Sequence, residues 1–128
     1  MKRLEGLHGF WASCGHACRG IQYAIHSQRN FRVHLLAAVL VIAAAVGLRF
    51  SRVEFILTLL TVTLVILGEL LNTSIEFVLN LLETRHHPVV RTAKDIAAGG
   101  VFLTVAGSVL VGLLLFGPRL WAIVRNLF

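Results

Sequence analysis

Charged residues are scarce in this sequence. Only 14% of its 128 residues are Asp, Glu, Lys or Arg, whereas 57% are hydrophobic, and the mean hydropathy is +0.82. A soluble domain of this length keeps a large surface relative to its volume and cannot bury so much apolar surface. The composition therefore argues against a soluble protein and favours an integral membrane protein, in which lipid covers the apolar faces.

Cysteines are also few, and they are poorly placed for a metal site. Cys14 and Cys18 lie one helical turn apart, but a metal site would need further ligands at suitable spacing, and none lie nearby. We interpret both as packing residues of a helix. The first long apolar run follows a basic lead of about 30 residues, so we expect no cleavable signal peptide.

Three long apolar runs predict three transmembrane helices, at about residues 33–50, 55–82 and 97–116. The second run exceeds the thickness of a bilayer, so we expect one of its ends to project into water. Residues 1–30 carry apolar side chains every three or four positions, which predicts an amphipathic helix that lies on the membrane or packs on the other helices. The sequence shows no internal repeat and no linker, so we predict one all-α membrane domain over residues 1–128.

Basic residues cluster beside the apolar runs. The formal net charge is +6, and this distribution indicates anchoring at the membrane surface, so we expect no nucleic-acid partner. Eight of the twelve Lys and Arg residues lie in the N-terminal segment and in the loop after the second run. By the positive-inside rule, the N-terminus and this loop are cytoplasmic and the C-terminus is outside.

A polar stripe interrupts the second apolar run. Its members follow helical spacing and share one helix face: Glu69, Asn72, Thr73, Glu76 and Asn80. A carboxylate at bilayer depth costs at least ~2.5–3.5 kcal/mol, so it indicates a functional site. The alternative is a polar seam that joins the helices of an oligomer.

The loop that follows the stripe is rich in groups that bind phosphate: Arg85, His86, His87, Arg91 and Lys94. Together with the two carboxylates of the stripe, these groups supply a base, metal ligands and cationic clamps, which are the parts of a phosphoryl-transfer site. No Walker loop and no protein-kinase motif occurs in the sequence.

The stretch "ELLNTSIE", followed by "AKDIAAGG", closely resembles the signature of the prokaryotic diacylglycerol kinase family, which includes undecaprenol kinases. The upstream "GIQYAIHSQRNFRVH" resembles the family's surface helix and its entry into the first span. This resemblance implies a homotrimer with three transmembrane helices and one surface helix per chain. It also implies active sites between subunits, which transfer the γ-phosphate of Mg-ATP to a lipid hydroxyl.

The resemblance further implies roles for individual residues. Glu69 matches the catalytic base and lies near the lipid substrate with Asn72 and Ala98, and Glu76 matches a ligand of Mg²⁺. The residues that match ATP contacts are His16, Gln28, Glu76, Arg85, His86, His87, Lys94 and Asp95.

The sequence departs from the family pattern at three positions. Gln28 stands where a second metal-binding Glu is frequent, Asn80 replaces a frequent Asp, and Arg85 replaces a common Glu. Each change removes negative charge, so we expect weaker metal binding, compensated by stronger phosphate binding. Gln28 still offers a carbonyl oxygen to Mg²⁺.

The stretches "QRNFRVH" and "HHPVV" look more like the undecaprenol kinase branch, so we expect undecaprenol as the acceptor, with diacylglycerol as the alternative. The expected location is the cytoplasmic membrane of a bacterium. Two other classes of protein also fit a membrane glutamate: a small proton-coupled transporter and a non-catalytic scaffold. The transporter would not need the cationic loop, and its usual four spans exceed the three predicted here.

Overall fold

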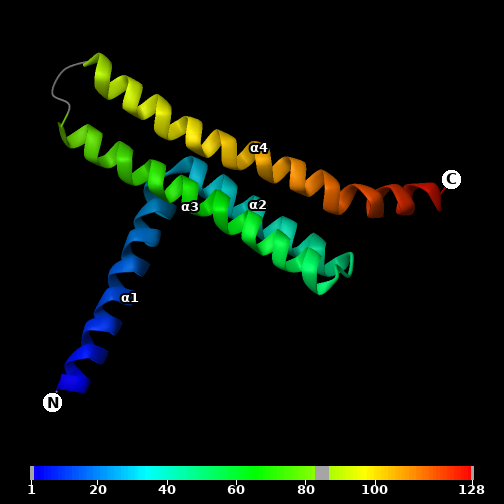
Figure 1. Ribbon diagram of the computed structural model, residues 1–128, viewed down its shortest axis with the longest axis horizontal. Helices are drawn as coiled ribbons and strands as arrows, with labels where there is room; N and C mark the ends of the chain where they lie inside the picture. Colours follow the sequence, from blue (N-terminus) through cyan, green and yellow to red (C-terminus); the bar gives the residue numbers. More distant parts are fainter. Residues whose placement is uncertain (1, 83–86, 128) are drawn as a thin grey trace.

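The computed structural model describes residues 2–82 and 87–127, with side chains from residue 9 onward. The described residues form four helices: α1 Lys2–Ser27, α2 Arg29–Gly47, α3 Arg52–Leu82 and α4 Pro88–Arg125. The helices α2, α3 and α4 run side by side, and α1 projects from them at a steep angle (Figure 1). By length and composition, α2, α3 and α4 could each cross a membrane. The predicted all-helical chain with three apolar spans is therefore confirmed.

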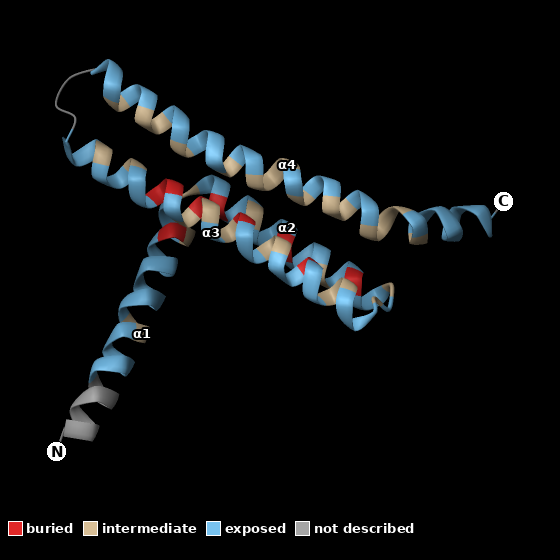
Figure 2. Cartoon of the chain, in the orientation of Figure 1, coloured by how far each residue is buried: buried red, intermediate tan, exposed pale blue. Residues whose placement is uncertain are grey.

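Helix α3 is the centre of the arrangement, because α2 and α4 both pack against it. On α2, the buried residues Phe31, Ala38 and Ala45 recur every seven positions, so they form one face. Figure 2 shows that the buried residues gather where α2 meets α3 and where α1 joins them. Most other apolar side chains of the three long helices are exposed, as expected for surfaces covered by lipid or by another chain.

The contact between α3 and α4 is close at Gly68. A Cβ atom added there would lie 3.2 Å from Thr104 Oγ1, so only glycine allows this approach without a shift of the threonine. Near the other end of the pair, Arg119 of α4 binds Glu54 of α3. These two contacts establish the antiparallel register of α3 and α4.

The junction between α1 and α2 is a single extended residue. Gln28 has φ −109° and ψ 115°, and its side chain makes no capping hydrogen bond to α2. Arg32 Nη1, in the first turn of α2, donates hydrogen bonds to the carbonyl oxygens of Ile25 (3.2 Å) and His26 (3.1 Å). Carbonyl groups in the last turn of a helix have no partner within the helix, so Arg32 supplies one for the end of α1. This contact ties the direction of α1 to that of α2.

Helix α4 is longer than the predicted span. Its 38 residues extend from Pro88 to Arg125 and cover about 57 Å at 1.5 Å per residue, which exceeds the hydrocarbon core of a bilayer. The helix continues through Pro118 instead of ending there, and it changes direction in its C-terminal part (Figure 1). Proline removes one backbone hydrogen bond, which explains a bend at this position.

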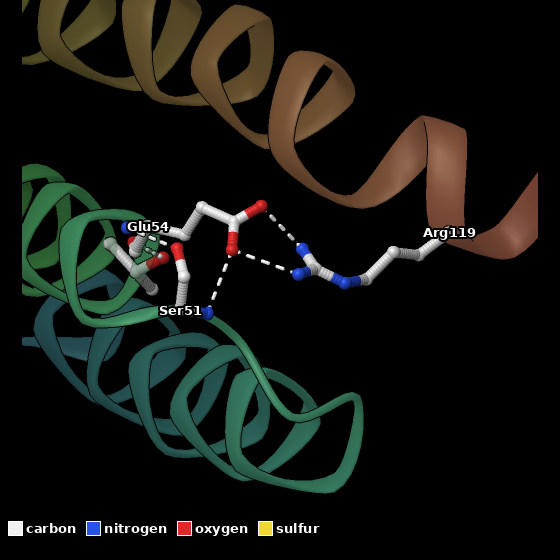
Figure 3. A network of polar contacts seen from close by, with 4 residues as sticks. Ser51, Glu54 and Arg119 are labelled. Carbon is white, nitrogen blue, oxygen red and sulfur yellow. Dashed lines mark hydrogen bonds and ion pairs between the residues drawn. The ribbon is translucent and has the colours of Figure 1, made fainter.

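A polar clasp, formed by Ser51, Glu54 and Arg119, joins the ends of α3 and α4 far from the polar stripe (Figure 3). Both guanidinium nitrogens of Arg119 donate to the Glu54 carboxylate, and the Nη2–Oε2 distance is 2.8 Å. The backbone N–H of Ser51 donates to the same carboxylate at 2.7 Å. The Arg119 guanidinium also lies 4.4 Å from the centre of the Phe50 ring, and this ring contacts Phe116. The clasp therefore holds the α2–α3 loop and α4 together.

We expect Arg119→Gln to lower the melting temperature of the purified protein, because Glu54 then loses both charged donors and α4 loses its contact with the loop. Arg125→Gln, the same change at an exposed arginine of α4, is the matched control and should leave the melting temperature nearly unchanged. Thermal unfolding in detergent, followed by circular dichroism, measures both. Equal melting temperatures for the two variants would show that the clasp does not stabilise the fold.

Candidate functional site

The polar stripe lies on the face of α3 that packs against the other helices. Glu69 is 3% exposed, and Asn72 and Thr73 are also buried. Glu76 is half-buried, and Asn80 near the end of the helix is exposed. The stripe thus passes from a deeply buried carboxylate to one accessible from the loop, about 10 Å away along the helix axis.

Asn72 orients the outer carboxylate. Its Nδ2 donates a hydrogen bond to Glu76 Oε1 at 3.2 Å. A carboxylate can only accept, so the amide nitrogen must face Glu76 and the amide oxygen must point elsewhere. Asn72 Oδ1 is buried and has no hydrogen-bond partner among the described residues. It is therefore an acceptor available to a ligand or to another chain.

His34 of α2 lies within electrostatic range of the buried carboxylate. It lies on the α2 face that carries Phe31 and Ala38, both buried against the other helices, and it interacts electrostatically with Glu69. His34 was not among the site residues predicted from the sequence. The available signal was an ionisable residue just inside the first apolar span, a position where such residues are rare.

An apolar groove of about 510 Å³ extends from His34 along α2, α3 and α4. Its walls are mainly aliphatic: Ala37, Val41, Val65 and Val109 are among the lining residues, and Phe116 lies towards the clasp. The groove exists because α2 and α4 both pack on α3 more extensively than on each other. Val65, which lines the groove, precedes Glu69 by four residues, so this end of the groove lies about one helical turn from the buried carboxylate.

The cationic end of α4 lies beside the outer part of the stripe. The register established by Gly68–Thr104 and Glu54–Arg119 puts Lys94 and Asp95 level with the turn of α3 that follows Glu76. Lys94 is half-buried, whereas Asp95 and Ala98 are exposed. A single chain thus puts Lys94 level with the turn after Glu76 but leaves Asp95 and Ala98 on an open surface.

Helix α1 brings Gln28 towards the site and leaves His16 away from it. The rings of Tyr23 and Phe77 meet edge to face with their centres 6.0 Å apart, so the end of α1 lies against the turn of α3 that carries Glu76. Gln28 follows at the junction and is half-buried. His16 is exposed on the projecting part of α1, where its Nδ1 lies 2.9 Å from Arg19 Nη2.

Only part of the predicted phosphate-binding loop can be placed. Arg85 and His86 lie outside the described residues. His87 is the N-cap of α4, and its Nδ1 accepts a hydrogen bond from the backbone N–H of Val89 at 3.3 Å. His87 therefore caps the N-terminus of α4, immediately before Pro88, which is the first residue of the helix.

The oxygen donors of the site suit a metal ion that takes most of its ligands from the phosphates of a bound nucleotide. No group of three or more His, Cys, Asp or Glu side chains that could hold a metal is found in residues 2–82 and 87–127. Mg²⁺, however, commonly binds through one or two carboxylates together with substrate phosphates. The half-buried Glu76 is such a carboxylate, and the Gln28 side chain, which makes no capping hydrogen bond, offers a neutral amide oxygen. These residues fit Mg²⁺ bound as a nucleotide complex.

Chemically, the arrangement combines a buried carboxylate, an apolar groove about one helical turn from it, and a polar region with Glu76, His87 and Lys94 where α3 ends and α4 begins. This combination suits a reaction between an apolar substrate with a polar head and a charged substrate from water.

Comparison with known proteins identifies the family of the chain. The family model of prokaryotic diacylglycerol kinase matches residues 15–116. The chain is 38% identical to an undecaprenol kinase of Bacillus subtilis over 89% of this chain and 93% of that protein. It is 41% identical to a diacylglycerol kinase of Synechocystis over 82% of this chain, but only 61% of that protein. It is 30% identical to a diacylglycerol kinase of Haemophilus influenzae over 91% of this chain and all of that protein. The relatives are lipid kinases, and the chain belongs to the prokaryotic diacylglycerol kinase family.

Proposed function

We propose that the protein is an ATP-dependent kinase that transfers the γ-phosphate of Mg-ATP to the hydroxyl of a membrane lipid alcohol. The observation that carries this proposal is the buried Glu69 carboxylate, which lies one helical turn from Val65 of the apolar groove and about two turns from Glu76. A lipid alcohol brings an apolar tail and one hydroxyl, and ATP brings charge from the water side.

In the proposed reaction, Glu69 accepts the proton of the lipid hydroxyl while the hydroxyl oxygen bonds to the γ-phosphorus. The bond between the γ-phosphorus and the bridging oxygen to the β-phosphate breaks, and ADP leaves. Lys94 and His87 contact the phosphates, and the lysine compensates part of their charge. Helix packing around Glu69 excludes water, so the lipid hydroxyl is favoured over hydrolysis.

Glu76 and Gln28 are the residues that we propose for Mg²⁺. The Asn72 amide holds Glu76 in place, and this positioning is the role that we assign to Asn72 on the nucleotide side. When bound, Mg²⁺ would supply positive charge that neutralises the phosphate oxygens.

Undecaprenol is the acceptor that we propose. The undecaprenol kinase of B. subtilis is 38% identical over 93% of its own length. The diacylglycerol kinase of H. influenzae, which matches over its whole length, is 30% identical, and that of Synechocystis is 41% identical over only 61% of its length. Diacylglycerol is the alternative, because both molecules offer a hydroxyl on an apolar body.

We further propose a homotrimer with shared sites in the bacterial cytoplasmic membrane. Three spans of one chain cannot enclose both a nucleotide and a lipid head group, and Asp95 and Ala98 face away from the chain's own core. His16 lies on the projecting part of α1, so we propose that it contacts ATP at a site shared with a neighbouring subunit. The predicted sidedness places the N-terminus and the α3–α4 loop in the cytoplasm, where ATP is available.

The test is ATP consumption by the purified chain that depends on an added lipid alcohol. Undecaprenol and diacylglycerol are supplied side by side in detergent micelles with Mg-ATP, and the phosphorylated lipid is quantified. Faster turnover with undecaprenol supports the proposal, and faster turnover with diacylglycerol supports the alternative acceptor. Absence of any phosphorylated lipid, with a folded protein, would contradict the kinase function.

Gln28→Glu should lower the Mg²⁺ concentration required for half-maximal activity, because a second charged ligand strengthens a cation site. The same change should weaken ATP binding when metal is scarce, through repulsion of the phosphates. A Mg²⁺ titration of activity at fixed ATP compares wild type with Gln28→Glu, and Gln22→Glu on the exposed face of α1 is the control. Superimposed curves for all three proteins would show that residue 28 does not face the metal.

A further inference from the structure

Thr73 carries a buried hydroxyl without a partner. The residue is 7% exposed, and its Oγ1 has no hydrogen-bond partner among the described residues. Helical Ser and Thr side chains usually satisfy themselves by bonding to the carbonyl oxygen one turn earlier. Thr58, Thr61 and Ser74 of α3 each do so, with distances of 2.7 to 2.9 Å. The Thr73 hydroxyl therefore points away from its own helix backbone.

The position of Thr73 puts this hydroxyl beside the reacting groups. Glu69, Thr73 and Phe77 follow one another at four-residue spacing, so they form one ridge of α3. Phe77 is the last of these three residues, and its ring contacts that of Tyr23 of α1. Neighbours at this spacing have Cβ atoms about 5–6 Å apart, so two of their side chains can contact the same small group. Thr73 also lies between the levels of Glu69 and Glu76, where an acceptor oxygen would meet the γ-phosphate.

Hydrogen-bond chemistry narrows what Thr73 can bind. An ionised Glu69 and Asn72 Oδ1 can only accept hydrogen bonds, and Asn72 Nδ2 already donates to Glu76. A lipid hydroxyl that gives its proton to Glu69 still has an oxygen that can accept a bond. Two buried side-chain atoms of the described residues have no partner, Asn72 Oδ1 and Thr73 Oγ1. Of these two, only the Thr73 hydroxyl can donate a hydrogen bond to this oxygen.

We infer that Thr73 is a substrate-binding residue, whose hydroxyl donates a hydrogen bond to the oxygen of the lipid alcohol and holds it beside Glu69. This inference rests on the proposed kinase function and deepens it. One lone pair of the acceptor oxygen then takes the bond from Thr73, and the other attacks the phosphorus while Glu69 takes the proton. Thr73 takes no proton and forms no covalent bond.

The test compares Thr73→Val, which keeps the shape of the side chain, with Thr73→Ser, which keeps the hydroxyl. KM for the lipid alcohol, KM for ATP and kcat are measured for the full chain with undecaprenol and Mg-ATP in micelles. We expect Thr73→Val to raise KM for the lipid by about tenfold or more, the loss of one hydrogen bond, with KM for ATP nearly unchanged. Thr73→Ser should stay within about threefold of wild type. Ser74→Ala, which removes the neighbouring exposed hydroxyl, is the control.

Three results would overturn the inference. They are an unchanged lipid KM in Thr73→Val, a Thr73→Ser variant as impaired as Thr73→Val, and an equal rise of both KM values. If Thr73→Val alters the melting temperature or the oligomeric state, Thr73→Ala decides by the same lipid KM. Failure of the kinase function is distinguishable, because the wild type would then phosphorylate no lipid at all.

Discussion

Glu69→Gln is expected to lower kcat by about 10²–10⁴-fold, the usual contribution of a general base. Glutamine keeps the size of the side chain but cannot accept the proton of the lipid hydroxyl. Glu69 is 3% exposed and lies two turns from Glu76, so the change should leave the nucleotide end intact. ATP binding, measured by equilibrium titration with a fluorescent analogue, should stay near the wild-type value.

The matched control is Glu54→Gln, the same substitution at the other end of α3. Glu54 belongs to the polar clasp with Arg119, so this variant should lose thermal stability and keep its turnover at a temperature where it is folded. A Glu69→Gln protein with turnover within about threefold of wild type would show that another group accepts the proton. Loss of ATP binding in Glu69→Gln would instead show that Glu69 is required for the structure of the ATP-binding part of the site.

Glu76→Gln and Asp95→Asn are each expected to abolish most activity, and mixed trimers of the two should recover part of it. Glu76 faces inward from α3, whereas Asp95 is exposed on α4, so we propose that they meet across a subunit interface. In a cyclic trimer assembled at random from equal amounts, about one site in four combines an intact Glu76 with an intact Asp95 of the neighbour.

The measurement uses two affinity tags, one on each variant, so that mixed trimers are purified and their composition is verified. The control is a mixture of Glu76→Gln with Glu69→Gln. Both changes lie on α3, and if Glu69 and Glu76 serve the same site, this mixture should stay inactive. Mixed trimers of Glu76→Gln and Asp95→Asn without any recovered activity would contradict shared sites.

The spans and the polar stripe could be predicted because they depend on local sequence. Apolar runs long enough for a bilayer must become helices, since lipid offers no partner for the backbone. Helical periodicity then puts Glu69, Asn72 and Thr73 on one face, and all three are buried in the structure. The family signature lies in the same stretch, so the assignment to the family followed from the sequence and was confirmed.

Contacts between residues far apart in the chain could not be predicted. No local pattern pairs Glu54 with Arg119, because 65 residues separate them and their meeting depends on the register of α3 and α4. The bend and continuation of α4 beyond Pro118 are of the same kind, since proline ends some helices and kinks others. The projecting direction of α1 depends on one extended residue, Gln28, and on the Arg32 contact.

The sequence by itself determined the class of the protein, the three apolar helices, the face that carries the carboxylates and the family, because composition, period and motif are local properties. The tertiary structure decided which groups come close: His34 within electrostatic range of Glu69, Lys94 level with the turn after Glu76, and the clasp that holds α4 to the loop. It also decided that the buried Thr73 hydroxyl has no hydrogen-bond partner among the described residues. Side-chain rotamers and helix register depend on packing between helices. This packing depends on the positions of all the helices together, so no local stretch of sequence determines it.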